Sequence, residues 1–94
     1  MGLKNWRWIK YSKNPVISNG PEGSWDDHFV RDPCVIYEAG EYRMWYWGNI
    51  AIGYASSKDG INWHKYEKNP VFFEDPEAKR PCVIHKGDTY YLYY

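Results

Sequence analysis

The sequence predicts an all-β protein made of short antiparallel strands. Aromatic residues make up 20% of the 94 residues, and the six Trp and ten Tyr among them favour pleated strands. Apolar residues alternate with polar ones or form short runs between Gly, Pro, Asn and Asp, which is the pattern of strands and turns. The third observation is an internal repeat, which predicts how the strands are grouped.

The repeat consists of two blocks that each occur twice. Residues 8–16 match residues 63–71 at seven of nine positions, at a shift of 63 − 8 = 55. The run Pro-Cys-Val-Ile occurs at residues 33–36 and again at residues 81–84, at a shift of 81 − 33 = 48. A period of about fifty residues with several short strands in each copy is typical of β-propeller blades. We therefore expect four-stranded antiparallel sheets arranged as blades.

The repeat divides residues 1–94 into three parts of one partial propeller domain. Residues 5–16 would hold the outer strand of a preceding blade, residues 31–71 a complete blade, and residues 79–94 the inner two strands of the next blade. The expected strands are 5–11, 34–37, 42–47, 50–56, 63–66, 82–85 and 89–94. Both faces of the strand at 42–47 carry large side chains, so we expect it to be covered on both sides.

The turn at residues 57–63 resembles an Asp-box hairpin. Asp59 is expected to accept hydrogen bonds from backbone amides of its own turn, and Gly60 to adopt a positive φ. Trp63 is expected to pack beneath this loop. This motif predicts fold rather than chemistry.

Composition excludes several classes of function. Twelve basic and twelve acidic residues with a pI near 6.8 give no basic footprint for nucleic acid or an anionic membrane. No stretch has the apolar length of a transmembrane helix, and the absence of a signal peptide pattern predicts a cytoplasmic protein. The three His show no ligand spacing, so neither a metal site nor a cofactor is expected.

The two cysteines occupy equivalent repeat positions. Cys34 and Cys82 are expected to be small buried thiols, because neighbouring inner strands would hold their Cα atoms beyond the range of about 4.4–6.8 Å that a disulfide needs.

Two blades do not close a ring, since propellers have at least about four. The aromatic strand at residues 90–94 would also leave an unpaired edge, which soluble proteins avoid. Either several copies assemble head to tail, with a trimer of two blades each as the favoured homo-oligomer, or the chain is a fragment of a longer protein.

Several motifs resemble the blades of five-bladed propeller glycosidases. They are Trp25-Asp26-Asp27, Arg31-Asp32-Pro33, and the runs at residues 41–46, 52–63 and 69–71. The group is similar to the clan of glycoside hydrolase families 43, 32 and 68 and to the related mannoside phosphorylases. The resemblance implies a carbohydrate ligand and a site at the channel end where the innermost strands begin.

The resemblance implies that Asp32 is the acidic residue at the start of an innermost strand, in a catalytic position. Arg31 and Arg80 would line the same channel and contact the sugar, and Arg80 stands where the second copy would carry the aspartate (32 + 48 = 80). Glycoside hydrolysis needs two carboxyl groups, and the general-acid glutamate of the group has no clear match here. Alternatively, Asp32 caps its strand and pairs with Arg31 or Arg80.

The loop before Arg31 offers a second group of candidates. Trp25 could stack on a sugar while Asp26 and Asp27 bind its hydroxyl groups, or Trp25 could fill the interface between blades above two solvated aspartates. Trp45 and Trp47 lie in mid-strand and are expected to pack between blades.

Three functions remain open from the sequence. The chain is a glycosidase-like module that binds carbohydrate, or an active glycoside hydrolase or phosphorylase formed by a ring of chains, or a non-catalytic structural remnant of a propeller.

Overall fold

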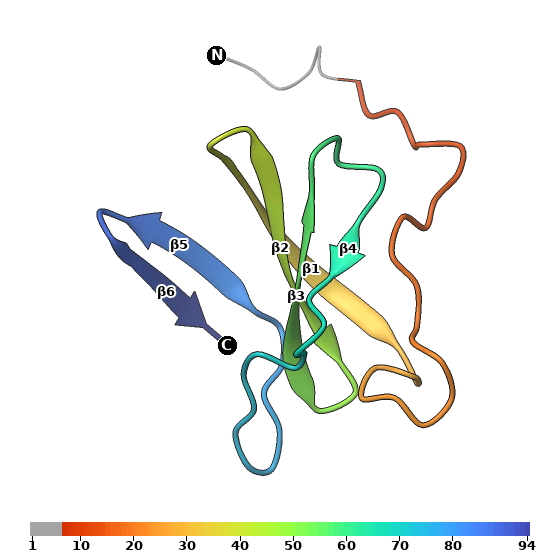
Figure 1. The fold of residues 1–94 in the computed structure, drawn as a ribbon, viewed down its shortest axis with the longest axis vertical. Helices are drawn as coiled ribbons and strands as arrows, with labels where there is room; N and C mark the ends of the chain where they lie inside the picture. Colours follow the sequence, from red (N-terminus) through yellow and green to blue (C-terminus); the bar gives the residue numbers. More distant parts are fainter. Residues whose placement is uncertain (1–6) are drawn as a thin grey trace.

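The computed structural model describes residues 7–94, which form two antiparallel sheets (Figure 1). The strands are β1 (Val30–Glu38), β2 (Glu41–Gly48), β3 (Ala51–Ser57), β4 (His64–Lys65), β5 (Cys82–Lys86) and β6 (Thr89–Tyr93). The first sheet has the order β1-β2-β3-β4, and the second pairs β5 with β6. Residues 7–94 contain no helix, and hence none long and apolar enough to cross a membrane. The prediction of an all-β fold with antiparallel sheets is confirmed.

The central strands β2 and β3 follow the predicted alternation. On β2, the side chains of Met44 and Tyr46 are buried on one face, and those on the other face are half-buried. The strand is therefore covered on both sides, as its large side chains predicted. β4 is limited to two residues, which pair with Ser56 and Ala55 of β3.

The strand β1 starts earlier than predicted and contains a bulge. It pairs with β2 from Val30 onwards, and the register of this pairing shifts between Arg31 and Cys34. Asp32 lies in this bulge with a φ of 51°. Asp is among the few non-glycine residues that tolerate this left-handed region, because its short side chain can bond locally. The bulge bends the start of the strand and turns Asp32 towards solvent.

The strand predicted at residues 5–11 is not formed in the described part of that segment, residues 7–11. Residues 5 and 6 lie outside the described residues. Ile9 is 92% exposed, so this stretch is not packed into either sheet. The matching segment around Lys65 is a strand because β3 offers it an edge. The second sheet has two strands and no counterpart of β3, so residues 7–11 have no equivalent edge to pair with.

The core lies on the face of the first sheet that the loop at residues 17–29 covers. Met44, Tyr46 and Ala55 form its buried centre. The partly buried side chains packed against this centre are Ile17, Trp25, Val30 and Trp63. Burial of these aromatic and aliphatic groups supplies the main driving force for folding this sheet.

The second sheet packs beside β1 and β2 through a few specific contacts. The Cys34 Sγ accepts a hydrogen bond from the Val83 amide at 3.1 Å. The rings of Trp45 and Tyr90 lie 5.8 Å apart, so Trp45 packs between the two sheets. Glu38 adds a polar contact, with its carboxylate 2.7 Å from Nδ1 of His85.

The two cysteines are both free, and their environments differ. Cys34 is half-buried between β1 and β5, whereas Cys82 is exposed. The prediction of a buried thiol is therefore wrong for Cys82. β5 is covered on one face, which buries Val83. Successive side chains of a strand point to opposite faces, so its neighbours Cys82 and Ile84 point to solvent.

The predicted turn at residues 57–63 is confirmed in detail. The Asp59 carboxylate accepts hydrogen bonds from the amides of Ile61 and Asn62 at 2.9 and 2.8 Å. These amides, that of Asn62 first, hold the pKa of Asp59 well below its usual value. Gly60 has a φ of 76°, and Trp63 donates from Nε1 to the Gly60 carbonyl at 3.0 Å.

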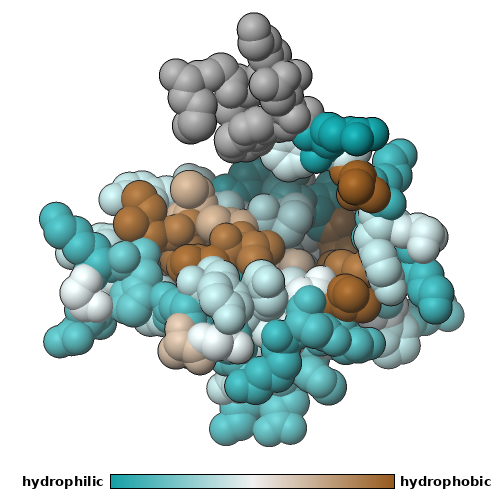
Figure 2. Space-filling view, turned by 90° about the horizontal axis from the view of Figure 1, so that it is seen from above, coloured by the Kyte–Doolittle hydropathy of each residue, from teal (hydrophilic) through white to brown (hydrophobic). Residues whose placement is uncertain are grey.

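Apolar side chains also remain on the surface. Figure 2 shows hydrophobic residues gathered in patches among hydrophilic ones on the face seen from above. Along the C-terminal strand and its end, Tyr91, Tyr93 and Tyr94 are each about half exposed. Groups of this kind mark surfaces that pack against something else more often than isolated apolar residues do.

Candidate functional site

Four segments meet at one end of the first sheet. They are the loop at residues 17–29, the start of β1, the turn between β2 and β3, and the segment at residues 66–81, which lie together at the lower end of Figure 1. All of the site residues predicted from the sequence belong to these segments.

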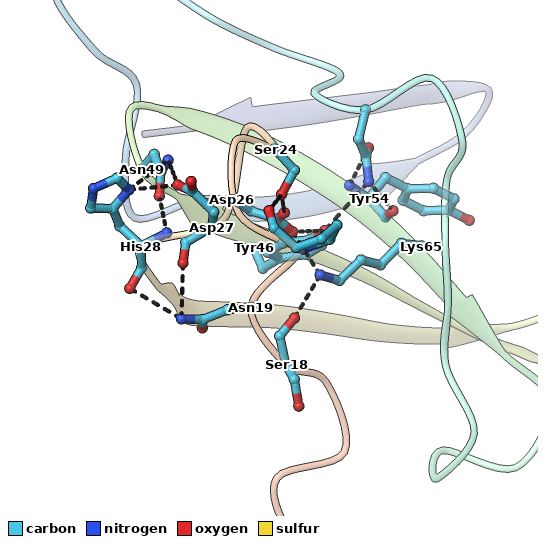
Figure 3. A network of polar contacts seen from close by, with 12 residues as sticks. Ser18, Asn19, Ser24, Asp26, Asp27, His28, Tyr46, Asn49, Tyr54 and Lys65 are labelled. Atoms are coloured by element: carbon cyan, nitrogen blue, oxygen red, sulfur yellow. Dashed lines mark hydrogen bonds and ion pairs between the residues drawn. The ribbon is translucent and has the colours of Figure 1, made fainter.

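Asp26 is buried rather than available to a ligand. Its side chain is 3% exposed, and its Oδ2 lies 2.7 Å from Nζ of Lys65 (Figure 3). The hydroxyl groups of Tyr46 and Ser24 each donate to this carboxylate at 3.3 Å. Burial, followed by the neighbouring charge of Asp26, raises the pKa of Tyr46 well above its usual value. Asp26 thus fastens the loop to the core face of the sheet.

The Trp25 ring packs against the sheet at two glycines. A Cβ added at Gly53 would lie 2.5 Å from the Trp25 ring, and one at Gly48 would lie 2.8 Å from it. The Trp25 and Tyr46 rings lie 5.6 Å apart. The indole thus packs over the strands, while stacking on a sugar and filling an interface between blades both stay predictions for Trp25.

Asp27 orients an exposed imidazole. Its Oδ1 lies 2.5 Å from Nδ1 of His28 and accepts a hydrogen bond from Nδ2 of Asn49 at 3.0 Å (Figure 3). The Gly23 amide donates to the other oxygen at 2.7 Å. The Asn49 bond is the largest of the effects that lower the pKa of Asp27 from 3.8 to about 2, followed by those from Gly23 and His28. The carboxylate therefore stays ionised at neutral pH and holds the ring in place.

Three cationic side chains surround the indole of Trp47. The guanidinium carbons of Arg31 and Arg80 lie 5.9 and 5.8 Å from the ring centroid, and Nζ of Lys79 lies 5.9 Å from it. Arg31 also lies 4.3 Å from the centroid of Phe29. Two arginines predicted from different repeat copies are thus brought to one aromatic ring, where cation–π attraction holds them.

Asp32 stands at the same end of the sheet with an exposed carboxylate. None of the ion pairs among residues 7–94 involves Asp32, Arg31 or Arg80, so the salt bridge considered as an alternative for Asp32 is not formed. Arg80 has a φ of 56°, close to the 51° of Asp32. Asp32 before Pro33 and Arg80 before Pro81 thus have the same left-handed backbone.

An apolar cavity of about 780 Å³ opens beside this group. Its apolar walls come from Trp25, Phe29, Ile50, Ala51, Pro70 and Phe73. His28 and Asn49 also line it. The sequence interpretation missed His28 and Asn49 as site residues. The signal that could have found them is the Gly48-Asn49 pair, a turn that brings Asn49 back towards the loop at residues 17–29, where it takes a φ of 49°.

The described residues hold no group of three or more His, Cys, Asp or Glu side chains that could bind a metal ion. The polar and aromatic groups at this end are cationic side chains, an exposed carboxylate and aromatic rings. Glu77, a second carboxylate of the region, has Oε1 2.8 Å from Nζ of Lys79.

No protein-family model matches the chain, and no solved structure matches it. Among curated proteins, it is 32% identical over 99 residues to an uncharacterised protein of Mycobacterium tuberculosis, covering 90% of this chain and 32% of the relative. It is 26% identical over 110 residues to a β-1,2-mannobiose phosphorylase of a Thermoanaerobacter species, covering 94% of this chain and 36% of that one. A 1,2-β-oligomannan phosphorylase of the same strain is 28% identical, with 90% and 34% covered.

The chain spans about a third of the length of the curated relatives it matches. These similarities indicate a distant, glycoside hydrolase-like relationship to two mannoside phosphorylases.

Proposed function

We propose that this chain is a carbohydrate-binding module of a glycosidase-like β-propeller, with its sugar site around Trp47. Arg31, Arg80 and Asp32 would contact the sugar. The observation that supports this proposal is the convergence of two arginines, unpaired among the described residues, on one aromatic ring beside an exposed carboxylate.

The chemistry of these groups suits a sugar. Guanidinium groups donate several hydrogen bonds in a fixed plane, and a carboxylate accepts them from hydroxyl groups. In this proposal the half-buried ring of Trp47 would offer an apolar surface to the C–H face of a sugar ring. The distant relationship to mannoside phosphorylases makes a β-mannoside the first ligand to test.

Other predicted residues contribute to this module indirectly. Trp25 and Asp26 hold the loop at residues 17–29 on the sheet, and Asp27 orients His28. The four-stranded sheet corresponds in this proposal to one blade and β5-β6 to the inner half of the next. A homo-oligomer, with a trimer favoured, would complete the ring.

Binding is tested by titrating the protein with methyl β-mannoside and β-1,2-mannobiose and following heat and Trp fluorescence. We expect saturable binding that Asp32→Asn and Arg80→Gln each weaken about tenfold, because charged hydrogen bonds contribute about 1.5–3 kcal/mol each. Lys58→Gln, an exposed side chain of the turn after β3, is the matched charge control and should leave binding unchanged. Equal affinities in all variants would refute the site.

Catalysis by the same site is the second candidate function, favoured by the phosphorylase relatives. In that case Asp32 would act as an acid or base. Its test is the release of mannose 1-phosphate from β-1,2-mannobiose and phosphate, which Asp32→Asn should abolish. Saturable binding without turnover in the wild-type protein would refute the proposal of an enzyme and agree with the proposal of a binding module.

The assembly proposal has its own test. Light scattering of the purified chain should give a mass that is a multiple of 11.3 kDa, three times this value for a trimer. A monodisperse monomer over the micromolar range would refute self-assembly without bearing on the sugar site.

A further inference from the structure

The cavity next to Trp47 has the character of a ligand subsite. Its walls are aromatic or aliphatic, and its volume of about 780 Å³ lies within the range of about 300–1,000 Å³ that small-molecule sites occupy. Ile50 and Phe73, on two different segments, are about half exposed, so the cavity is open to an entering group.

The cavity and the proposed sugar site share a wall. The Phe29 ring lines the cavity and also lies 4.3 Å from the Arg31 guanidinium and 4.8 Å from the Trp47 ring. On the other side, Nε1 of Trp47 donates to the carbonyl of Asn49, another cavity residue, at 2.9 Å. A molecule whose polar part lies on Trp47 can therefore extend an apolar part past Phe29 into the cavity.

The cavity offers the ligand one polar ring, that of His28. Asn49 is bonded to the loop, since its Nδ2 donates to Asp27 and lies 3.5 Å from Nδ1 of His28, and its Oδ1 accepts from the His28 amide at 3.1 Å. The ionised Asp27 carboxylate lies 2.5 Å from Nδ1 of His28 and favours the tautomer protonated there. In the neutral imidazole, Nε2 is then the acceptor, on a side chain that is 78% exposed.

We propose that the cavity binds the apolar aglycone of a glycoside, an aromatic ring in particular, while Nε2 of His28 accepts a hydrogen bond from a hydroxyl group of the sugar. This inference rests on the proposed sugar site, and it names an aryl glycoside as a ligand that binds more tightly than a β-mannobiose. The apolar walls have little to offer a second sugar unit, whose hydroxyl groups would lose water without gaining partners.

The experiment compares methyl β-mannoside with p-nitrophenyl β-mannoside by calorimetry. We expect the aryl glycoside to bind about tenfold more tightly or better, because burial of an aromatic ring in an apolar cavity is favourable, and tenfold corresponds to about 1.4 kcal/mol. Ile50→Ala with Phe73→Ala should remove most of this advantage while methyl β-mannoside binds as before. Ile84→Ala is the matched control, since Ile84 is as exposed as Ile50, at 50%, and lies on β5 outside the cavity.

The contribution of His28 is tested with His28→Phe, which keeps a ring at the cavity but has no acceptor. Binding of both mannosides should weaken several-fold. A ¹⁵N spectrum of the neutral imidazole in the free protein should show the Nδ1-protonated tautomer, and Asp27→Asn should shift the ring towards the other tautomer.

Three outcomes separate this inference from the proposed function. Equal affinity for the methyl and aryl mannosides would overturn the aglycone site and leave the sugar site standing. An aryl advantage that survives the Ile50→Ala and Phe73→Ala changes would also overturn it. If neither mannoside binds, the sugar site is refuted, and amide shifts of Ile50 and Phe73 on adding p-nitrophenol then decide whether the cavity takes an aromatic ring. No shifts would overturn the cavity proposal as well.

Discussion

The ion pair between Asp26 and Lys65 is predicted to be essential for holding the loop at residues 17–29 on the sheet. The perturbation is Lys65→Met, which keeps the length and apolar stem of the side chain but removes the ammonium group. It leaves the Asp26 carboxylate, 3% exposed, without a countercharge and with hydroxyl donors at 3.3 Å from Tyr46 and Ser24. The Ser18 carbonyl also loses the Lys65 hydrogen bond of 2.6 Å.

The magnitude follows from the burial of the two partners. Removing one member of a fully buried pair costs about 3–5 kcal/mol. Because the Lys65 side chain is 29% exposed, water can compensate in part, and we expect a smaller loss of about 2–3 kcal/mol. Asp26→Asn keeps the shape and loses charge-assisted bonds, so it should cost about 1.5–2 kcal/mol.

Urea unfolding followed by Trp fluorescence measures these changes in the free energy of unfolding. The variant with both Lys65→Met and Asp26→Asn completes a double-mutant cycle. The losses should not add, and the coupling free energy should be about 1–2 kcal/mol, because removing both charges leaves no buried charge unpaired. Lys58→Met is the control, since Lys58 is 82% exposed and pairs with Glu41 at 3.7 Å, a geometry that contributes at most about 0.5 kcal/mol. A coupling below about 0.5 kcal/mol would show that the reasoning about burial is wrong.

Three further predictions concern the same end of the molecule. Gly53→Ala should destabilise the protein by about 1–3 kcal/mol, because the new methyl group would lie 2.5 Å from the Trp25 ring, and a lower Tm with quenched or shifted Trp fluorescence would report it. The pKa of Asp27 is lowered from 3.8 to about 2, so its contribution to the free energy of unfolding is present above about pH 4 and is lost as the pH falls through 2. When the pH is lowered from about 5 to about 2, the urea midpoint should therefore fall less in Asp27→Asn than in the wild type. Asp32→Gly should leave stability unchanged or raise it by up to about 1 kcal/mol, because glycine adopts the φ of 51° without strain, while mannoside binding is lost; a clear fall in Tm would contradict this account of the bulge.

The parts of the fold that the sequence predicted are those encoded by neighbouring residues. The alternation of side chains between the two faces of residues 42–47 is sufficient to predict β2, because the side chains of a single strand decide which of its faces is buried. The Asp59 turn likewise depends on bonds between residues two or three apart. Such features can be derived without knowing what lies across the molecule.

The features that the sequence did not predict depend on distant partners. Asp26 is an ordinary loop carboxylate until Lys65, 39 residues later, is placed beside it. Trp25 could stack on a ligand until Gly48 and Gly53 provide room for its ring on the sheet. The segment at residues 7–11 matches β4 in sequence but lacks the edge that makes β4 a strand.

The bulge of β1 links backbone geometry to the proposed function. A non-glycine residue in the left-handed region costs about 1–2 kcal/mol, and glycine would remove this cost. Yet Asp32 and Arg80, at matching repeat positions directly before Pro33 and Pro81, both have such a backbone. Asp and Arg share neither charge nor size, so one packing requirement does not explain both side chains. The proposed sugar site would give both side chains a role, since a sugar at this end of the sheet would contact the exposed carboxylate of Asp32 and the guanidinium of Arg80 near Trp47.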